Sequence, residues 1–279
     1  MSQEKLVKIS NIALQKQANN KLACGLDIAV QSSDYSPRSM PWNSNDYLMN
    51  VDRTGVLSSP EKTASLQPML WNDLCSEYDA ENFCKYLEQS GLELSPAFKS
   101  FEGVWRKDEY SHYLGFLRIY SRLYEEPEEE VAKRLEHRKA DFKPIDRFLK
   151  DEFTIALLLA YDEIATAKAY SQDYKLYTSF EDPDYLKWIK LVTRDESIHF
   201  TNLTKLINFK YPNRIPEVSQ LVSQFIEWDL EGGEYKGTFV LDHEGGDYFT
   251  PEFLRDCGRI INHALDPKKP VTIPSAANI

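Results

Sequence analysis

Two short stretches of the sequence place a glutamate three residues before a histidine, and each glutamate follows an aspartate. The first reads WRKDEYSH and the second reads VTRDESIH. On a helix, residues three apart lie on one face, so Glu109 and His112 would project together, as would Glu196 and His199. Iron and manganese accept mixed oxygen and nitrogen ligands of this kind. The two stretches therefore predict a metal site.

A single Glu-x-x-His match carries little information. With 24 glutamates and five histidines in 279 residues, chance alone gives roughly 0.4 such matches. Two matches, each preceded by Asp and each inside a strong helical pattern, form a much rarer combination. A chance arrangement of surface residues is therefore the less favoured interpretation.

Two further glutamates lie in helical patterns that could complete the site. The apolar stretch TIALLLAYDEIATAKAY contains Glu163, which would be costly to bury unless it is paired or bound to a metal. Upstream, LWNDLCSEYDAENFCKYLEQS carries Glu77 and Glu81 on one helix face. We favour Glu81 as the ligand from this helix and keep Glu77 as the alternative.

Long helical patterns with little Gly or Pro must position these residues. They cover residues 69–90, 96–124, 127–140, 145–174, 183–209, 215–231 and 250–264. Ser95-Pro96 and Asp182-Pro183 mark two helix starts, with proline at the first helical position.

The organisation expected from these patterns is an irregular N-terminal arm at 1–60, a helical domain at 61–265 and a tail at 266–279. The arm contains the loop-like QSSDYSPRSMPWNSND, and a short helix is expected at 4–19. Residues 232–250 could form a small hairpin.

Composition limits the classes of function. The formal net charge is −11, which does not favour binding to nucleic acid or to an anionic membrane surface. No run of about 18 apolar residues is present, so no membrane-spanning helix is expected. Four cysteines without CxxC spacing are typical of reduced thiols, and the N-terminus lacks a signal-peptide pattern. We expect a cytoplasmic protein.

The constellation resembles the soluble acyl-carrier-protein desaturases, which belong to the ferritin-like di-iron class. That family has Trp four residues before the first Glu-x-x-His glutamate, as at Trp105 here. It has an acidic residue directly before both such glutamates, here Asp108 and Asp195. It also has Thr three residues after the lone glutamate of the third helix, here Thr166.

A weaker element of the resemblance concerns the first helix. The family has Tyr five residues after the first-helix glutamate, and Tyr86 stands in this position relative to Glu81. The resemblance covers roughly residues 70–265 and is strong in the motifs but thin between them.

The resemblance implies an all-α fold, a ferritin-like four-helix bundle with extra helices and an irregular N-terminal arm. It implies two iron ions held by six side chains, Glu81, Glu109, His112, Glu163, Glu196 and His199. Glu109 and Glu196 would bridge the ions, each histidine would bind one ion, and Glu81 and Glu163 would cap the ends.

Residues around these ligands also receive roles from the resemblance. Asp195 would accept the N–H of His112, and Asp108 that of His199, which fixes each ring. Thr166 would help to deliver a proton beside the oxygen-binding face, although a helical threonine can simply bond to its own backbone.

The implied reaction is O2-dependent desaturation of an acyl chain, either free or bound to an acyl carrier protein. Two electrons must come from an external donor, a ferredoxin or a small reductase, because no flavin or nicotinamide motif is visible. Trp105 is either a core residue or part of the electron path. A homodimer is also expected from the resemblance.

Departures from the family pattern leave the substrate open. Family members often carry Arg before each ligand histidine, where this chain has Ser111 and Ile198. Hydroxylation, N-oxygenation or oxidative C–C cleavage of a small molecule are alternatives, although one N-oxygenase pattern has His where Val192 stands. A ferroxidase or iron-binding protein, and a helical interaction protein, are further alternatives from other classes.

Overall fold

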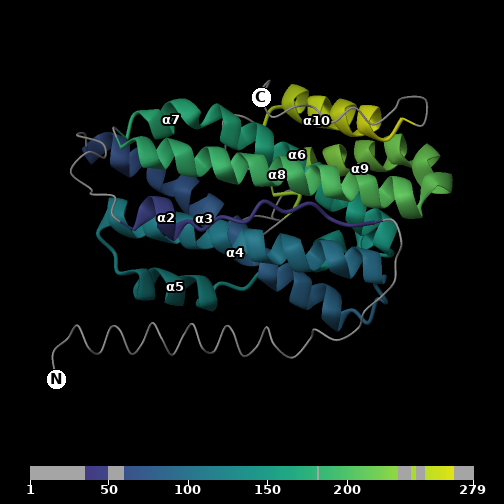
Figure 1. Ribbon diagram of the computed structural model, residues 1–279, viewed down its shortest axis with the longest axis horizontal. Coiled ribbons are helices and arrows are strands. Elements are labelled where there is room, and N and C mark those ends of the chain that lie inside the picture. Colours follow the sequence, from purple (N-terminus) through teal and green to yellow (C-terminus); the bar gives the residue numbers. More distant parts are fainter. Residues whose placement is uncertain (1–34, 50–59, 181, 232–239, 243–248, 267–279) are drawn as a thin grey trace. The chain divides into compact units, whose positions relative to one another are not determined.

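Helices account for all the regular structure in the part of the chain that the computed structural model describes, residues 35–49, 60–180, 182–231, 240–242 and 249–266. The predicted all-α fold is confirmed (Figure 1). The α-helices are α2 (Asn45–Leu48), α3 (Pro60–Gln89), α4 (Pro96–Tyr124), α5 (Glu128–His137), α6 (Glu152–Gln172), α7 (Tyr174–Thr178), α8 (Pro183–Lys210), α9 (Val218–Glu231) and α10 (Pro251–Ala264). Two 3-10 helices, η2 (Lys143–Phe148) and η3 (Pro212–Glu217), join them.

The proline-marked helix starts form as predicted. The Ser95 side chain accepts a hydrogen bond from the backbone N–H of Phe98 at the start of α4, and Asp182 caps α8 in the same way. Such caps satisfy backbone donors that have no partner within the helix. At its other end, α4 stops at Glu125, whose φ of 56° places it in the left-handed region.

Three predicted helix boundaries were wrong. α3 begins at Pro60 rather than at residue 69 and keeps the exposed Pro68 inside it. The stretch predicted as one helix over 145–174 is divided into η2, α6 and α7. The reason is local, because Asp151 is extended and its side chain caps the backbone N–H of Thr154 at 2.9 Å. The stretch 215–231 likewise divides into η3 and α9.

Several predictions fall outside the described residues. They are the short helix at 4–19, most of the hairpin at 232–250 and nearly all of the tail at 266–279. The described part of the N-terminal arm, residues 35–49, is extended and ends in α2. We call residues 35–49 the strap. None of the described helices is long and apolar enough to cross a membrane.

The long helices α3, α4, α6 and α8 pack side by side, with α3 against α4 and α6 against α8 (Figure 1). Their directions follow from cross-helix contacts. Trp105 contacts Glu163 while Phe116, further along α4, contacts Tyr170, so α4 and α6 run parallel. α3 and α8 both run antiparallel to α4. The long connection through α5 and η2 makes the parallel pair possible.

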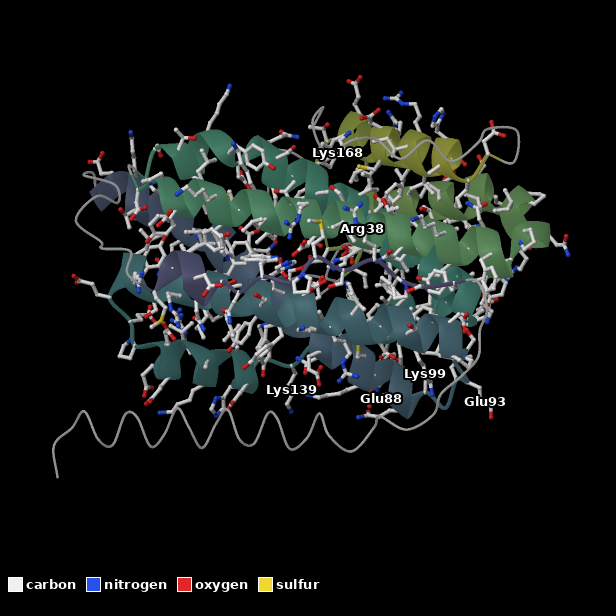
Figure 2. All side chains as sticks on the ribbon, in the orientation of Figure 1. Arg38, Glu88, Glu93, Lys99, Lys139 and Lys168 are labelled. Carbon is white, nitrogen blue, oxygen red and sulfur yellow. The ribbon has the colours of Figure 1, made fainter. Side chains whose placement is uncertain are left out.

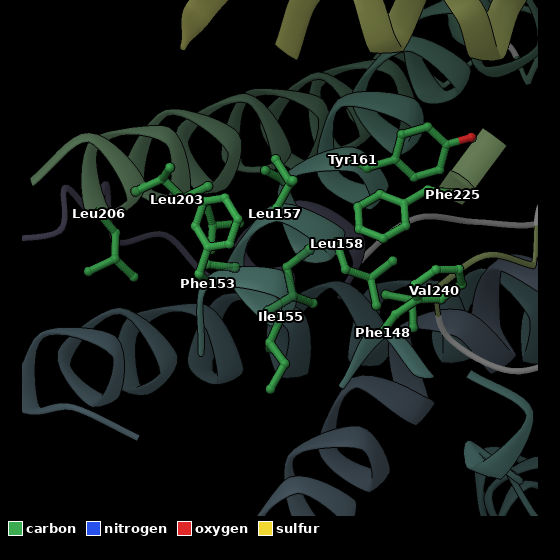
Figure 3. Packing of buried hydrophobic residues seen from close by; sticks show 14 of the residues in the cluster. Phe148, Phe153, Ile155, Leu157, Leu158, Tyr161, Leu203, Leu206, Phe225 and Val240 are labelled. Atoms are coloured by element: carbon green, nitrogen blue, oxygen red, sulfur yellow. The ribbon is translucent and has the colours of Figure 1, made fainter. Parts of the chain in front are cut away.

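α6 lies at the centre of this packing, and nearly every one of its side chains is buried. Figure 3 shows Phe153, Leu157 and Tyr161 of α6 among apolar side chains of η2, α8 and α9. A second apolar cluster, which includes Phe116 and Trp188, fills the other end of the bundle. The predicted metal ligands other than Glu81 lie between these two clusters.

The close approach of α4 and α8 depends on a glycine. A methyl group at Gly115 would overlap the Trp188 ring, whereas Gly103 on the same helix has open space around it. We expect Gly115→Ala to lower the free energy of unfolding by about 1–3 kcal/mol. Gly103→Ala should raise it by about 0.5–1 kcal/mol, because alanine is the better helix former. Urea unfolding of both variants checks this, and equal effects would contradict the packing.

Candidate metal centre

Buried carboxylates and imidazoles from four helices converge at the middle of the bundle. Two groups of ligand atoms each lie within 4.8 Å of one another. The first group is Glu77, Glu109, His112 and Glu196, and the second is Glu109, Glu163, Glu196 and His199. The groups share Glu109 and Glu196, so each of these carboxylates lies between two possible metal positions. Both groups could hold a metal ion.

The two histidines present the same ring nitrogen to the carboxylates. His112 Nδ1 lies 3.0 Å from Glu196 Oε1 and 3.4 Å from Glu77 Oε2. His199 Nδ1 lies 3.1 Å from Glu163 Oε2 and 3.2 Å from Glu109 Oε1. The rings themselves are 6.2 Å apart between centroids. A cation at either position would therefore meet one imidazole nitrogen and three carboxylate groups.

The opposite ring nitrogens face the two predicted aspartates. His199 Nε2 lies 3.3 Å from Asp108 Oδ2, and His112 Nε2 lies 3.5 Å from Asp195 Oδ2. Each aspartate belongs to the helix facing its histidine, as the resemblance to the desaturases implied. An aspartate in this position orients the ring and favours the tautomer whose Nδ1 is free to bind a metal.

Aromatic donors hold the outer oxygens of the two end carboxylates. Trp105 Nε1 donates to Glu163 Oε1 at 2.6 Å, and the Tyr170 hydroxyl donates to Glu77 Oε1 at 2.6 Å. In each case the other oxygen, Oε2, faces the cluster. The predicted residue Trp105 thus has a definite contact, a buried hydrogen bond to a carboxylate of the centre.

Several ligand atoms lack a hydrogen-bond partner within the described part of the chain. On the side that faces the centre these atoms are Glu77 Oε2, Glu109 Oε1, Glu196 Oε1 and His112 Nδ1, while His112 Nε2, on the side of Asp195, also has none. Leaving buried polar atoms unpaired costs about 1–3 kcal/mol each. The first four atoms face the same centre, so one bound cation at each position would satisfy them together.

The carboxylates and histidines perturb each other's proton affinity. Burial raises the pKa of Glu109 well above its ordinary value, and the charges of Glu196 and Glu77 add to the effect. Burial alone would lower the pKa of His112, but the same two carboxylates outweigh it and raise the pKa. Without a metal, the cluster therefore holds protons that a cation would displace on binding.

Glu81 does not belong to the cluster, which corrects the preferred first-helix ligand. Its side chain is 47% exposed and forms ion pairs with Arg106 and Lys85. Glu77, one turn earlier and 5% exposed, takes the inner position. Because α3 runs antiparallel to α4, Glu77 lies opposite His112, whereas Glu81 lies opposite Arg106. The spacing to Tyr86 was therefore misleading, since the Tyr86 hydroxyl donates to Asp146 instead.

Sequence reasoning missed Trp42 of the strap and Arg194 of α8. Trp42 Nε1 donates to Asp195 Oδ2, and Arg194 Nη2 donates to Asp195 Oδ1 at 2.9 Å. These bonds, together with the nearby imidazole, outweigh burial and lower the pKa of Asp195. The only signal for Trp42 was an aromatic residue within a loop-like stretch, which says nothing about its contact.

The strap itself is fastened to α4 and α8. The Ser44 hydroxyl donates to the backbone oxygen of Ser111 at 2.5 Å, and Asn202 exchanges two hydrogen bonds of 2.8 Å with the backbone of Arg38. Arg38 is labelled near the middle of Figure 2. Ser111, where the desaturase pattern often has Arg, thus helps to hold the strap over the site.

Thr166 lies on α6 one turn beyond Glu163 and is partly buried. This places it on the helix face of the centre, and its role in proton delivery stays a prediction.

No family model, curated protein or solved structure matches this chain.

Replacing one carboxylate oxygen of Glu77 or of Glu81 by an amide nitrogen tests which glutamate of α3 belongs to the centre. Loss of a hydrogen-bond partner of a metal ligand weakens metal binding roughly 10- to 100-fold. We expect Glu77→Gln, which alters a ligand itself, to weaken the binding of Mn²⁺ by more than this. Glu81→Gln should bind Mn²⁺ as the unaltered protein does, because its side chain pairs with Arg106 at the surface. Equilibrium titration measures both affinities, and the opposite order would restore Glu81 as the ligand.

The support of His112 can be tested through Asp195. Asp195→Asn should weaken binding of Mn²⁺ about 10- to 100-fold, because the imidazole loses its carboxylate acceptor. Trp42→Phe removes one donor to that carboxylate and should weaken binding in the same direction by less. Asp184→Asn, at a partly exposed residue of α8 paired with Lys187, is the matched control. Equal affinities for the Asp195→Asn and Asp184→Asn proteins would exclude this role.

Proposed function

We propose that the protein is an O2-dependent oxidoreductase with two iron ions bound inside a ferritin-like four-helix bundle. The observation that carries the proposal is the pair of ligand groups that share Glu109 and Glu196. Glu77 and His112 would complete one iron site, and Glu163 and His199 would complete the other. This is the ligand set of the di-iron carboxylate proteins, in which two helices each supply a Glu and the other two each supply a Glu-x-x-His pair.

The charges of the ligand set support two divalent ions. Four ionised carboxylates carry four negative charges, which two divalent cations would neutralise while the imidazoles stay neutral. A neutral centre is what an apolar core tolerates, because an uncompensated buried charge is expensive. Mixed carboxylate and imidazole ligands also favour iron or manganese over zinc, whose structural sites are often rich in cysteine.

When bound in its reduced form, the iron pair would supply a route from O2 to an oxidant that takes hydrogen from an unactivated C–H bond. The protein's own groups would prepare that chemistry. Trp105 and Tyr170 each hold one oxygen of an end carboxylate, which leaves the other oxygen for the metal. Asp108 and Asp195 orient the imidazoles. Thr166 would deliver a proton from its position one turn beyond Glu163.

The apolar surroundings of the centre support a hydrocarbon substrate. Phe101 and Leu159 are fully buried near one end of the ligand cluster, and Phe116 and Val192 near the other. Apolar side chains of this kind exclude water and would suit an acyl chain, in keeping with the resemblance to acyl-carrier-protein desaturases. A ferredoxin or small reductase would supply electrons, and an acyl carrier protein could present the substrate. A cytoplasmic homodimer belongs to the same proposal.

Anaerobic loading with Fe²⁺ followed by O2 tests the proposal. We expect about two iron ions per chain, and fewer than about half an ion would contradict it. The reduced, loaded protein is then mixed with O2 and a set of free and carrier-bound acyl chains, and products are weighed by mass spectrometry. Products lighter by two hydrogens indicate desaturation, whereas products heavier by one oxygen indicate insertion and favour the hydroxylase alternative.

The matched control is Glu196→Gln, which keeps the shape of a shared ligand but removes its charge. It should lose iron and product formation together. Consumption of Fe²⁺ and O2 without any altered acyl chain would instead identify a ferroxidase.

A further inference from the structure

A second group of acidic and phenolic side chains lies beside the metal centre. Its fixed point is Tyr170 of α6, whose hydroxyl donates to Glu77 of α3. From there Asp173 and Tyr177 follow at spacings of three and four residues. The backbone N–H of Tyr177 bonds to the carbonyl of Asp173 at 3.0 Å, so the chain keeps a helical path from α6 into α7. These three residues therefore lie along one face.

Asp73 of α3 approaches the same place. It precedes Glu77 by one helical turn, so both side chains project from one face of α3. α3 runs antiparallel to α6, and Glu77 is level with Tyr170. The turn before Glu77 is consequently level with the turn after Tyr170, where Asp173 and Tyr177 lie. The charges of Asp173 and Glu77 act on Asp73, in agreement with this register.

Tyr177 adds a buried hydroxyl to this group. The residue is 1% exposed, and its hydroxyl has no hydrogen-bond partner among the described residues. The acidic groups that act on this hydroxyl are Asp73, Asp173 and Glu77. An unpaired buried hydroxyl costs about 1–3 kcal/mol. Because carboxylates surround this hydroxyl, a cation is the kind of partner that would satisfy it.

The surroundings of Tyr177 are apolar. Tyr177 packs against Trp188 and Phe180 in the apolar cluster at this end of the bundle. Burial raises the pKa of Asp73 well above its ordinary value, and the charges of Asp173 and Glu77 raise it further. Asp73 is nevertheless partly exposed, whereas Asp173 and Tyr177 are buried. The group thus extends from the surface to Glu77.

We propose that Asp73, Asp173 and Tyr177 form an outer station at which a divalent metal ion binds before it passes to Glu77. Carboxylate and phenol oxygens suit a hard cation such as Mn²⁺ or Fe²⁺. Glu77 borders both places, so an ion held by the outer residues needs only to exchange oxygen ligands to enter the centre. The inference rests on the metal centre of the proposed function and adds a route of loading to it.

Rapid mixing of the metal-free full-length protein with Mn²⁺ tests the proposal, with loss of the free-ion electron paramagnetic resonance signal as the readout. Asp73→Asn should slow uptake about tenfold, because an acidic entry raises the local concentration of cations. Tyr177→Phe removes only the unpaired hydroxyl and should slow uptake while keeping the fold. Neither should change the number of ions bound at equilibrium.

Glu88→Gln is the matched control, since it removes one negative charge from an exposed residue of the same helix (Figure 2). Uptake by both Asp73→Asn and Tyr177→Phe at the control's rate overturns the outer station and leaves the centre intact. A lower number of ions in Asp73→Asn, without slower uptake, also overturns it, because Asp73 would then be part of the centre. If the unaltered protein binds no Mn²⁺, the outer station and the proposed function fail together.

Discussion

Four carboxylates buried within a few ångströms of each other are the constraint on which the rest of the structure depends. In an apolar core their mutual repulsion and lost hydration would oppose folding unless protons, hydrogen bonds or cations compensate. Glu109 and Glu196 lie at the centre, and each approaches both histidines. The same crowding would give the cluster affinity for cations, because a metal ion would offset several of these costs at once.

Three aromatic side chains each donate a hydrogen bond to one oxygen of a carboxylate in the cluster or beside it. Trp105 and Tyr170 come from inside the bundle, whereas Trp42 comes from the strap. Arg194 adds a cation beside Asp195 alone, and no equivalent ion pair is seen at Asp108 within the described residues. The two halves therefore share their ligand types but differ in their support, so the two positions are not equivalent.

The apolar clusters on either side hold the helices in the register that this arrangement needs. At one end Phe153 and Leu157 of α6 pack among neighbouring helices, and at the other Trp188 fills the space that Gly115 leaves open. A shift of one helix by a single turn would replace Glu77 by Asp73 or Glu81, and the convergence would be lost. Packing far from the ligands thus determines their geometry, because interiors are too dense to deform gradually.

The resemblance to the desaturases suggested that each aspartate faces the histidine of the opposite helix, a contact between helices that spacing alone does not give. The sequence patterns themselves predicted the helical class and the two Glu-x-x-His pairs. These depend on spacing within a helix, which 3.6 residues per turn makes predictable. Only the tertiary structure decided between Glu77 and Glu81, since both lie on one face of α3 and the choice follows from the neighbours across the helix pair. It also decided that Trp42 reaches Asp195, because contacts between segments 153 residues apart leave no periodic trace in the sequence.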